Sequence, residues 1–414
     1  MQGGQVLEFW IPYGETEVPI RVPDDNFYKI LEPSKPGKTK DPVSLVNESL
    51  DRPVDGSSIP ETVKPGATAG IMVDPLVPPA LRDVAVEQLR TRLEKAGVTA
   101  TKVFLRRRIS NVALPQSPQE GTRILDPASG NFSEIGQTGT GTKVFVEQEL
   151  LSCEVKICVA LTMPHFASGF TGGPEAILPG ASSTETIAKN RSLLVQGIVS
   201  PADQGDSTVL QDSLEACRLA GPFYSLCFVP DGWGGVDTVF SGELGAVFKE
   251  ARTRYLEVHG TKIDRRADVV VVSAGNVLGM DLYHSVRVLS NAWKAVKKDG
   301  TMVLVAECSK GVGDSSFLDY SRRFQERREL LTELRHRFKL GGHVNLLLQE
   351  ALEKYRVQLV SVLPDYYVRN SFRLKPSRTA SHAVQQAIRA EGKDAKILII
   401  TRGDLTLPVI GEQS

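Results

Sequence analysis

The sequence predicts an α/β protein of two domains, each with a mostly parallel sheet, and a cleft between the domains. Short apolar runs that suit buried strands alternate with amphipathic segments that suit helices, the pattern of a parallel sheet flanked by helices. The alternation begins afresh after Gly260, and 414 residues are more than a single core usually holds. The predicted domains are residues 1–258 and 259–414.

The composition sets limits on the partners and the location of the protein. The 49 Lys and Arg balance the 49 Asp and Glu, so the sequence predicts neither a nucleic-acid partner nor a membrane surface. The five cysteines are scattered and form no CxxC motif, which is typical of a reducing compartment. The first residues lack the basic and apolar regions of a signal peptide. A cytoplasmic location is therefore expected.

The first domain begins with a predicted hairpin, in which alternating residues at 6–12 and 18–22 flank a turn at 13–15. Residues 32–66, rich in Pro, Ser, Lys and Asp, are predicted to form a long surface insertion. The next expected elements are a strand at 68–73, a helix at 79–96, a strand at 102–105 and a polar loop with room for a hairpin at 112–142.

The rest of the first domain continues the alternation of strands and helices. An apolar strand is expected at 155–163, followed by a helix from about Ser183, where Ser182 and Glu185 have the spacing of a capping box. The remaining expected elements are a helix at 213–220, a strand at 224–229 and a helix at 243–257.

The second domain starts with the valine-rich strand 267–273, whose continuous apolar run suits burial on both faces. A long, heavily charged helix is expected at 317–338. The other expected elements are helices at 282–296, 344–355 and 380–391, and strands at 302–306, 358–362 and 396–401.

Polar or glycine residues follow several of the predicted strands. Ligands bind beyond the carboxyl ends of strands in open α/β sheets, and clefts between domains are favoured sites. These residues are therefore predicted to line one cleft, although an ordinary strand-terminating turn explains any one of them taken alone. The strand ends concerned are Asp74, the run Arg106, Arg107 and Arg108, His165, Gly275–Asn276 and Lys310–Gly311.

His165 is the strongest candidate for chemistry. It ends the apolar run of 155–163 and precedes a loop that contains Gly169, Gly172 and Gly173. A histidine there suits proton transfer or metal ligation, and a hydrogen-bonded structural histidine is the alternative. Glu175, beyond the glycines, is a candidate second base or metal ligand, or else a solvated turn residue.

Two further features lie in the second domain. His284 and Arg287 are three residues apart on a predicted helix and so share a face, where Arg287 could clamp a carboxylate or form a surface ion pair. The glycines Gly311 and Gly313 fit an anion-binding turn, a weak signal because such turns are common.

Over nearly its whole length the sequence resembles the nickel-dependent lactate racemase family. The motifs that carry the resemblance are the hairpin with Tyr13-Gly14, the segment from Pro164-His165 through Gly172-Gly173 to Pro179-Gly180, the strand Ala267 to Gly275 with Asp281-Leu-Tyr283, the segment Gly311 to Phe317, and Leu340 to His343. The resemblance implies two α/β domains with the active site between them.

The resemblance also implies a cofactor that this sequence departs from. In the family, a nickel ion sits in a pyridinium-derived pincer that is tethered to a lysine and completed by a histidine, while two other histidines exchange a proton. His165 falls on one of the proton-transfer histidines, and no histidine occurs near Arg107, where the other is expected. Glu175 falls on the tethering lysine and Arg191 on the nickel-binding histidine. A carboxylate cannot form the tether and a guanidinium cannot ligate nickel, so the nickel pincer is expected to be absent.

Other positions of the family's site are changed as well. Asp74 keeps the aspartate of a substrate-binding motif, and His284 and Arg287 fall on a family Gln and Lys. The resemblance, together with these changes, therefore implies a divergent racemase, epimerase or related enzyme that binds a small 2-hydroxy carboxylate through groups such as Arg107, Arg191 and Arg287. A non-catalytic protein that binds a carboxylate or nucleotide is the alternative. A homo-oligomer and the identity of any metal are left open.

Overall fold

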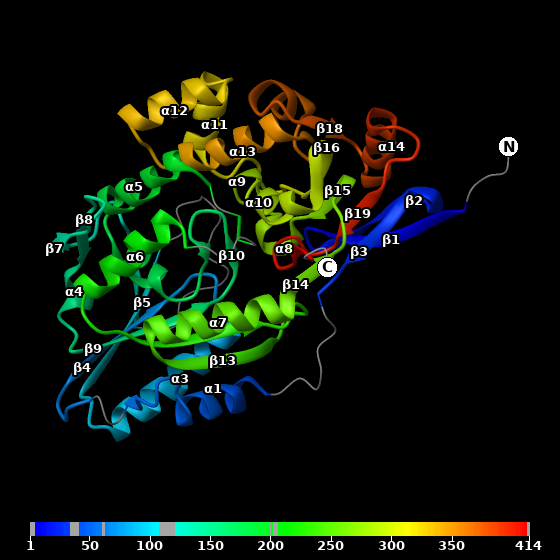
Figure 1. Ribbon diagram of the computed structural model, residues 1–414. Helices are drawn as coiled ribbons and strands as arrows, with labels where there is room; N and C mark the ends of the chain where they lie inside the picture. Colours follow the sequence, from blue (N-terminus) through cyan, green and yellow to red (C-terminus); the bar gives the residue numbers. More distant parts are fainter. Residues whose placement is uncertain are drawn as a thin grey trace. The chain divides into compact units, whose positions relative to one another are not determined.

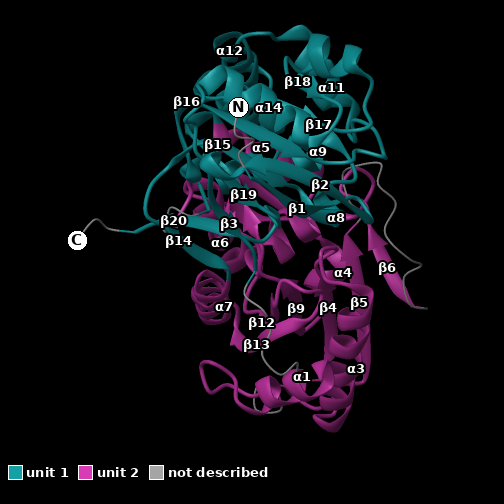
Figure 2. Cartoon of the chain, turned by 90° about the vertical axis from the view of Figure 1, so that its right-hand side faces the viewer, with its two compact units in different colours: residues 1–33, 195–205, 259–414 teal, residues 34–194, 206–258 magenta. Residues whose placement is uncertain are grey.

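The computed structural model describes residues 5–33, 41–59, 63–106, 121–198, 200–201 and 206–411. The chain divides into two compact units, which Figure 2 shows in two colours. Unit 1 consists of residues 1–33, 195–205 and 259–414, and unit 2 of residues 34–194 and 206–258. The predicted boundary after residue 258 coincides with the last change from unit 2 to unit 1. The predicted first domain is nevertheless not a single unit, because its N-terminal hairpin belongs to unit 1.

Unit 2 is built on a six-stranded sheet in the order β13-β12-β9-β4-β5-β6. Neighbouring strands are parallel except β12 and β13, which form an antiparallel hairpin. The central strands are buried along almost all of their length, which explains their continuous apolar sequences. The strands are β4 (Thr68–Val73), β5 (Ala100–Arg106), β6 (Thr122–Leu125), β9 (Val155–Leu161), β12 (Tyr224–Pro230) and β13 (Val236–Glu243).

The helices of unit 2 agree with the predictions in most cases, and Figure 1 shows where they run. The predicted polar loop holds a hairpin, since β7 (Phe132–Gln137) and β8 (Lys143–Glu147) pair antiparallel. The sequence analysis missed β13, which follows a glycine-rich turn. The helices are α1 (Pro42–Asp51), α3 (Pro79–Lys95), α4 (Gln148–Leu151), α5 (Thr184–Ser192), α6 (Thr208–Leu219) and α7 (Leu244–His259).

Helix α1 differs from the predicted surface insertion at 32–66. The side chain of Asp41 caps the helix by accepting a hydrogen bond from the amide of Ser44, and Pro42 occupies the first turn, where it is well tolerated. Leu45 and Leu50 are buried in the core of unit 2. Part of the insertion is therefore a packed helix, because its apolar residues have helical spacing that the polar composition of the segment obscured.

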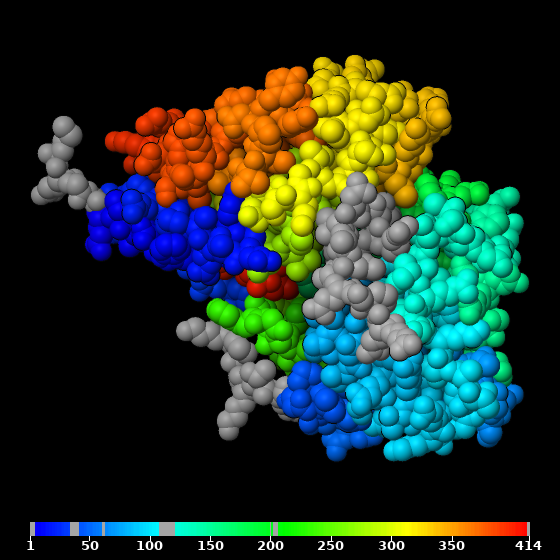
Figure 3. All heavy atoms as spheres, turned by 180° about the vertical axis from the view of Figure 1, so that it is seen from behind, coloured from blue at the N-terminus to red at the C-terminus, as the bar shows by residue number. Residues whose placement is uncertain are grey.

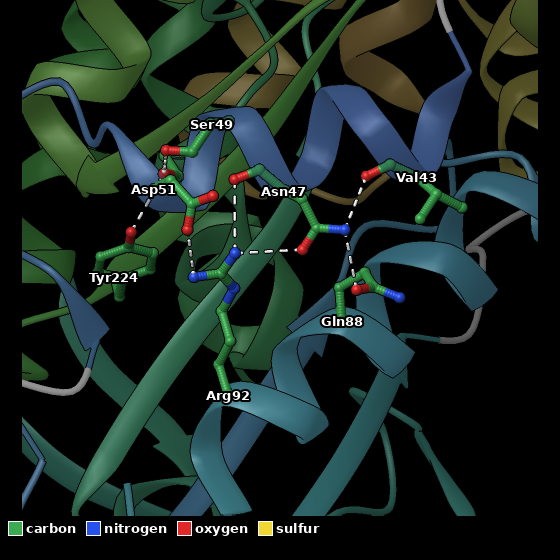
Figure 4. A network of polar contacts seen from close by, with 8 residues as sticks. Val43, Asn47, Ser49, Asp51, Gln88, Arg92 and Tyr224 are labelled. Carbon is green, nitrogen blue, oxygen red and sulfur yellow. Dashed lines mark hydrogen bonds and ion pairs between the residues drawn. The ribbon is translucent and has the colours of Figure 1, made fainter. Parts of the chain in front are cut away.

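Polar contacts fix α1 against α3, as Figure 4 shows. The guanidinium of Arg92 on α3 lies 2.8 Å from a carboxylate oxygen of Asp51 and donates to the side-chain oxygen of Asn47 at 3.1 Å. The carbonyl of Ser49 accepts a 2.7 Å hydrogen bond from the hydroxyl of Ser241 on β13. The helix is thus bound both to its neighbouring helix and to the edge of the sheet.

Unit 1 contains a second six-stranded sheet, in the order β18-β17-β16-β15-β19-β3, and all of its neighbours are parallel. β3 comes from the N-terminal segment, which explains why this segment belongs to unit 1. The strands are β3 (Phe27–Leu31), β15 (Ala267–Ser273), β16 (Val296–Val305), β17 (Arg356–Val360), β18 (Lys375–Ser377) and β19 (Ile397–Ile400).

The predicted N-terminal hairpin is confirmed as β1 (Val6–Tyr13) and β2 (Thr16–Pro23). Its inward side chains, among them Ile11 and Ile20, share a core with α14 (Ala380–Glu391). In Figure 3 the hairpin, in blue, accordingly lies beside the red and orange C-terminal segment. The two ends of the sequence therefore contribute to one core.

Two long predicted helices of unit 1 are broken in the structure. The segment 317–338 forms α11 (Ser315–Arg323) and α12 (Arg327–His336), with a non-helical Phe324 between them. The segment 282–296 forms α9 (Leu282–Ser285), α10 (Val288–Ala292) and a short 3₁₀ turn. The other elements of this unit are α8 (Gly275–Leu278), α13 (Gly342–Lys354), β14 (Gly260–Ile263) and β20 (Leu407–Ile410). No helix of the described residues is both long and apolar enough to span a membrane.

Candidate functional site

The candidate site of unit 2 lies where three neighbouring parallel strands end. β9, β4 and β5 are adjacent in the sheet and run in the same direction, so their carboxyl ends meet at one edge. Asp74 follows β4, Arg106 ends β5, and the loop that carries His165 follows β9. The predicted site residue Arg107 lies outside the described residues.

The ring of His165 is held in one orientation by its own loop. β10 (Pro164–His165) pairs antiparallel with β11 (Gly169–Phe170), and this small ribbon turns the chain back after β9. The imidazole Nδ1 accepts hydrogen bonds from the backbone amides of Ala167 at 3.2 Å and Ser168 at 3.3 Å. An Nδ1 that accepts from amides carries no proton, so we assign the neutral ring its hydrogen on Nε2.

Ser168 connects the two residues that the sequence analysis selected as catalytic. Its hydroxyl oxygen lies 2.7 Å from Oε1 of Glu175 and 3.2 Å from Nδ1 of His165. The same hydroxyl also lies 3.0 Å from the carbonyl oxygen of Phe170. The sequence analysis missed Ser168, because a serine in a glycine-rich loop carries no signal of its own.

Glu175 is an acid in an environment that disfavours its charge. Oε2 is completely buried and has no hydrogen-bond partner among the described residues. Burial raises the pKa of Glu175 to about 7, although the hydrogen bond from Ser168 and the positive charge of Arg191 act in the opposite direction. The negative charge of Asp74 adds to the increase. The structure thus brings both Asp74 and Arg191 within electrostatic reach of Glu175.

Buried thiols surround the turn that carries Glu175. Cys158 donates to the carbonyl oxygen of Gly173 at 3.7 Å, and Cys217 donates to that of Pro174 at 3.4 Å. Burial raises the pKa of both thiols, and it raises the pKa of the nearby Cys227 to about 12. The three thiols therefore stay protonated rather than acting as nucleophiles, and those of Cys158 and Cys217 act as hydrogen-bond donors that fix the turn.

Arg191 on α5 is buried, with an exposed fraction of 6%. Its Nη1 donates to the side-chain oxygen of Asn190 at 2.7 Å. Asn190 donates in turn to Asp212 on α6 at 2.8 Å, and Asp212 accepts a 2.5 Å hydrogen bond from Thr138. The guanidinium therefore belongs to a chain of polar groups that joins α5, α6 and the β7–β8 hairpin.

The predicted capping box of α5 is wrong by one residue. The cap is Ser183, whose side chain accepts from the amide of Thr186. The hydroxyl of Ser182 is buried and donates to the carbonyl of Ile177 at 2.7 Å. Two adjacent serines cannot be told apart by sequence pattern. The cap is the one whose backbone is extended directly before the first helical residue, and here that is Ser183.

In unit 1, His284 is paired with a carboxylate that the sequence analysis did not select. Asp281 is fully buried and caps α9 by accepting from the amide of His284 at 2.8 Å. The imidazole Nδ1 of His284 lies 2.8 Å from Oδ2 and 2.9 Å from Oδ1 of the same carboxylate. The absence of a side chain at Gly313 makes room, because a Cβ there would lie 2.5 Å from the Asp281 carboxylate.

Arg287 and Gly311 are the other predicted site residues of unit 1. Arg287 lies one turn after His284, and the two keep partial exposure whereas the other residues of 281–290 are buried. Gly311 has a positive φ of 78°, and its carbonyl accepts from the amide of Leu282 at 3.1 Å. It forms a turn that holds the start of α9, and anion binding there stays a prediction.

No three His, Cys, Asp or Glu side chains within the described ranges are grouped so that they could hold a metal ion. Metal ligation by His165 or Glu175 therefore gains no support from neighbouring side chains.

Comparisons with known proteins agree with the resemblance seen in the sequence. Residues 13–105 and 120–200 match the lactate racemase N-terminal domain, and residues 263–407 match the lactate racemase C-terminal domain. The lactate racemase of Thermoanaerobacterium thermosaccharolyticum is 22% identical over 95% of this chain and 97% of its own length. That of Lactiplantibacillus plantarum is 24% identical over 65% of each chain.

Solved structures give the same result for the fold. The lactate racemase apoprotein from T. thermosaccharolyticum has a TM-score of 0.85 at 19% identity and covers 97% of this chain and 100% of its own. A protein from Thermotoga maritima has a TM-score of 0.63 at 14% identity, with 91% and 100% covered. The expected α/β fold with mostly parallel sheets is thereby confirmed. The chain belongs to the lactate racemase family.

Proposed function

We propose that this protein is an isomerase-type enzyme that acts on a small hydroxy- or oxo-carboxylate without the tethered nickel group of its family. His165 is the residue that meets the substrate in this proposal. Its Nε2–H donates to a hydroxyl or carbonyl oxygen of the substrate and stabilises the negative charge that develops there.

The contact between Ser168, His165 and Glu175 carries the proposal. Backbone amides on Nδ1 keep an imidazole neutral, and a neutral imidazole can polarise a carbonyl oxygen through its other nitrogen. When Glu175 is protonated it can donate to the Ser168 oxygen at 2.7 Å while the Ser168 hydroxyl donates to Nδ1 at 3.2 Å, so Ser168 links the acid to the ring in that state. A buried carboxyl with a pKa of about 7 beside a hydrogen-bonded histidine is typical of catalytic sites.

The residues present do not fit the nickel pincer that the family resemblance implies. At the position of the tethering lysine stands Glu175, whose Oε1 is 2.7 Å from the Ser168 hydroxyl. At the position of the nickel-binding histidine stands Arg191, which has only donor nitrogens and uses one of them to contact Asn190 at 2.7 Å. Neither side chain can do what the pincer requires, since a carboxylate cannot form the tether and a guanidinium cannot ligate nickel.

Cationic side chains account for the choice of a carboxylate substrate. Arg191 lies close enough to Glu175 to lower the pKa of that carboxyl, and Arg287 in unit 1 keeps part of its surface exposed. A guanidinium can hold a carboxylate with two parallel hydrogen bonds. Within unit 2 the candidate for this contact is Arg191, and within unit 1 Arg287 is a separate candidate.

The experiment is a screen of 2-hydroxy and 2-oxo carboxylates with the full-length protein in deuterated water, read by NMR and chiral chromatography. For a converted substrate, the His165→Ala variant should lose roughly 100- to 1,000-fold in kcat, the usual effect of removing one such donor. The exposed His336 on α12 provides the control, and His336→Ala should keep wild-type kcat.

Two outcomes would contradict the proposal. Unchanged kcat in His165→Ala would remove His165 from the mechanism. A carboxylate that raises the Tm of the protein but is never converted would show instead that the protein binds carboxylates without catalysis and keeps only the family fold.

A further inference from the structure

Three histidines of this chain are held in two different tautomers. Nδ1 of His165 accepts from backbone amides, and Nδ1 of His343 accepts from the amide of Gly341 at 3.2 Å. Both neutral rings therefore carry hydrogen on Nε2. His284 is the opposite case, because its Nδ1 faces the carboxylate of Asp281, which can only accept when ionised. Its neutral ring has hydrogen on Nδ1 and an acceptor lone pair on Nε2.

The pairing of His284 with Asp281 is well fixed. The carboxylate is fully buried at the start of α9, where it accepts from the amide of His284 and lies close to Gly313. The His284 side chain keeps 13% exposure, whereas that of Asp281 has none. A buried carboxylate behind a partly exposed imidazole is the arrangement that prepares a histidine to accept a proton.

The surroundings of His284 suit an anionic substrate. In the segment 281–290 the side chains of His284 and Arg287 alone keep partial exposure, and they lie one turn apart. The amide of Arg287 donates to the carbonyl of His284 at 3.2 Å, which fixes the turn between them. A proton acceptor and a guanidinium are thus presented on one face of unit 1.

We propose that His284 is the general base of this protein and that its substrate is an oxo-carboxylate with a C–H bond next to the carbonyl group. Asp281 is the positioning residue that sets the tautomer and stabilises the imidazolium. This inference rests on the proposed function, and it names a base within unit 1 and a class of substrate. The carbonyl is required because it gives the electron pair of the broken C–H bond a place to go.

The proton transfer between the substrate carbon and His284 needs no other reactant. Nε2 of His284 takes the proton from carbon, the C–H electron pair forms the double bond of an enolate, and the carbonyl electrons move to oxygen. The imidazolium then returns the proton to the same carbon, from which the carbonyl and the neutral imidazole are restored. Return to the opposite face inverts a stereocentre, which is the chemistry of an epimerase.

The first test measures the tautomers directly and does not depend on activity. In ¹⁵N-histidine-labelled full-length protein, neutral His284 should give the Nδ1–H pattern, and His165 and His343 the Nε2–H pattern. In Asp281→Asn the Oδ1 contact with the His284 amide can remain, so the side-chain NH₂ faces Nδ1 and the ring should change to the Nε2–H form. An Nε2–H pattern for His284 in the wild type would overturn the inference.

The second test measures exchange of the C3 protons of 2-oxobutyrate with deuterated water, catalysed by the full-length protein. His284→Gln, which keeps the size of the side chain, should lower the exchange rate roughly 100- to 10,000-fold, the range of general base catalysis. Asp281→Asn should lower it through the wrong tautomer while the Tm stays close to that of the wild type, since asparagine also caps helices.

The outcomes separate this inference from the proposed function. Exchange that depends on His165 but not on His284 would overturn the inference alone. A wild-type protein that converts a hydroxy-carboxylate yet exchanges no oxo-carboxylate would overturn the substrate class. A wild-type protein that does neither would contradict the proposed function as well, whatever the tautomer of His284.

Discussion

At the scale of single residues, the hydrogen-bond partners of each histidine determine which ring nitrogen carries the hydrogen. His165, Ser168 and Glu175 form one contact chain within eleven positions of sequence, whereas His284 has its own carboxylate in Asp281. The two histidines that the sequence analysis singled out are therefore prepared for different tasks. His165 offers a donor, and His284 offers an acceptor.

The raised pKa of Glu175 has a measurable effect on stability. The folded protein holds this proton up to about pH 7, whereas the unfolded chain releases it near the ordinary value of 4.5. Because the folded state binds more protons between these values, the free energy of unfolding should fall as the pH rises through them, by on the order of 3 kcal/mol. In Glu175→Gln this contribution to the pH dependence should disappear.

Urea unfolding of the wild type and of Glu175→Gln at pH 4.5 and pH 8 tests this expectation. Other carboxylates titrate in both proteins, so the difference between the two pH profiles isolates Glu175. Parallel profiles would show that Glu175 is ionised in the folded protein at acidic pH.

The residues of the site were predictable only where a strand end or a family motif marked them. His165 follows β9 and Glu175 follows the glycine-rich loop, and the structure places the hydroxyl of Ser168 within hydrogen-bonding distance of both, whereas their catalytic role stays a prediction. Ser168 and Asp281 could not be found in this way, because their importance comes from the partner that the fold brings to them. Arg191 was predicted to bind substrate, and this stays a prediction. Its burial and its hydrogen bond to Asn190 were not predicted, because they depend on how α5 packs.

At the scale of elements, the loop between β9 and α5 depends on glycines for different reasons. Gly172 has a φ of 126°, and a Cβ there would lie 2.9 Å from the hydroxyl of Thr162 and 3.3 Å from the thiol of Cys227. Gly169 also has a positive φ, 78°, but a Cβ there would meet no atom within 4 Å. Position 172 therefore requires glycine both because a side chain would clash and because φ is positive, whereas position 169 requires it only because φ is positive.

The two glycines form a matched pair for mutation. Gly172→Ala should lower the free energy of unfolding by roughly 2–4 kcal/mol, because backbone strain and overpacking add. Gly169→Ala should cost about 1 kcal/mol, from the positive φ alone. Chemical denaturation measures both values. Equal losses would show that the turn can move away from Thr162 and Cys227.

The elements themselves were predictable where the apolar period was uninterrupted. The strand at 267–273 and the helix at 380–391 were predicted with the bounds that the structure shows. The break at Phe324 was not foreseen, since the segment has no glycine or proline and its charges suit a continuous helix. β13 has a signal that was overlooked, namely a glycine-rich turn between two runs of β-forming residues.

At the scale of the whole molecule, two six-stranded, mostly parallel sheets account for the length of the chain. Their alternating pattern was readable from sequence, because buried parallel strands are apolar throughout. The membership of residues 5–33 in unit 1 was not readable, since the pairing of β3 with β19 joins segments that are about as far apart as the chain allows. Long-range pairing leaves no mark in a local pattern.

The central claim is that this family fold has lost the groups that hold the nickel pincer. The most direct measurement is the intact mass of the protein purified from its native host, together with its nickel content. The account predicts the mass of the unmodified chain and no stoichiometric nickel. A mass increased by a covalently bound nucleotide, accompanied by one nickel per chain, would contradict it.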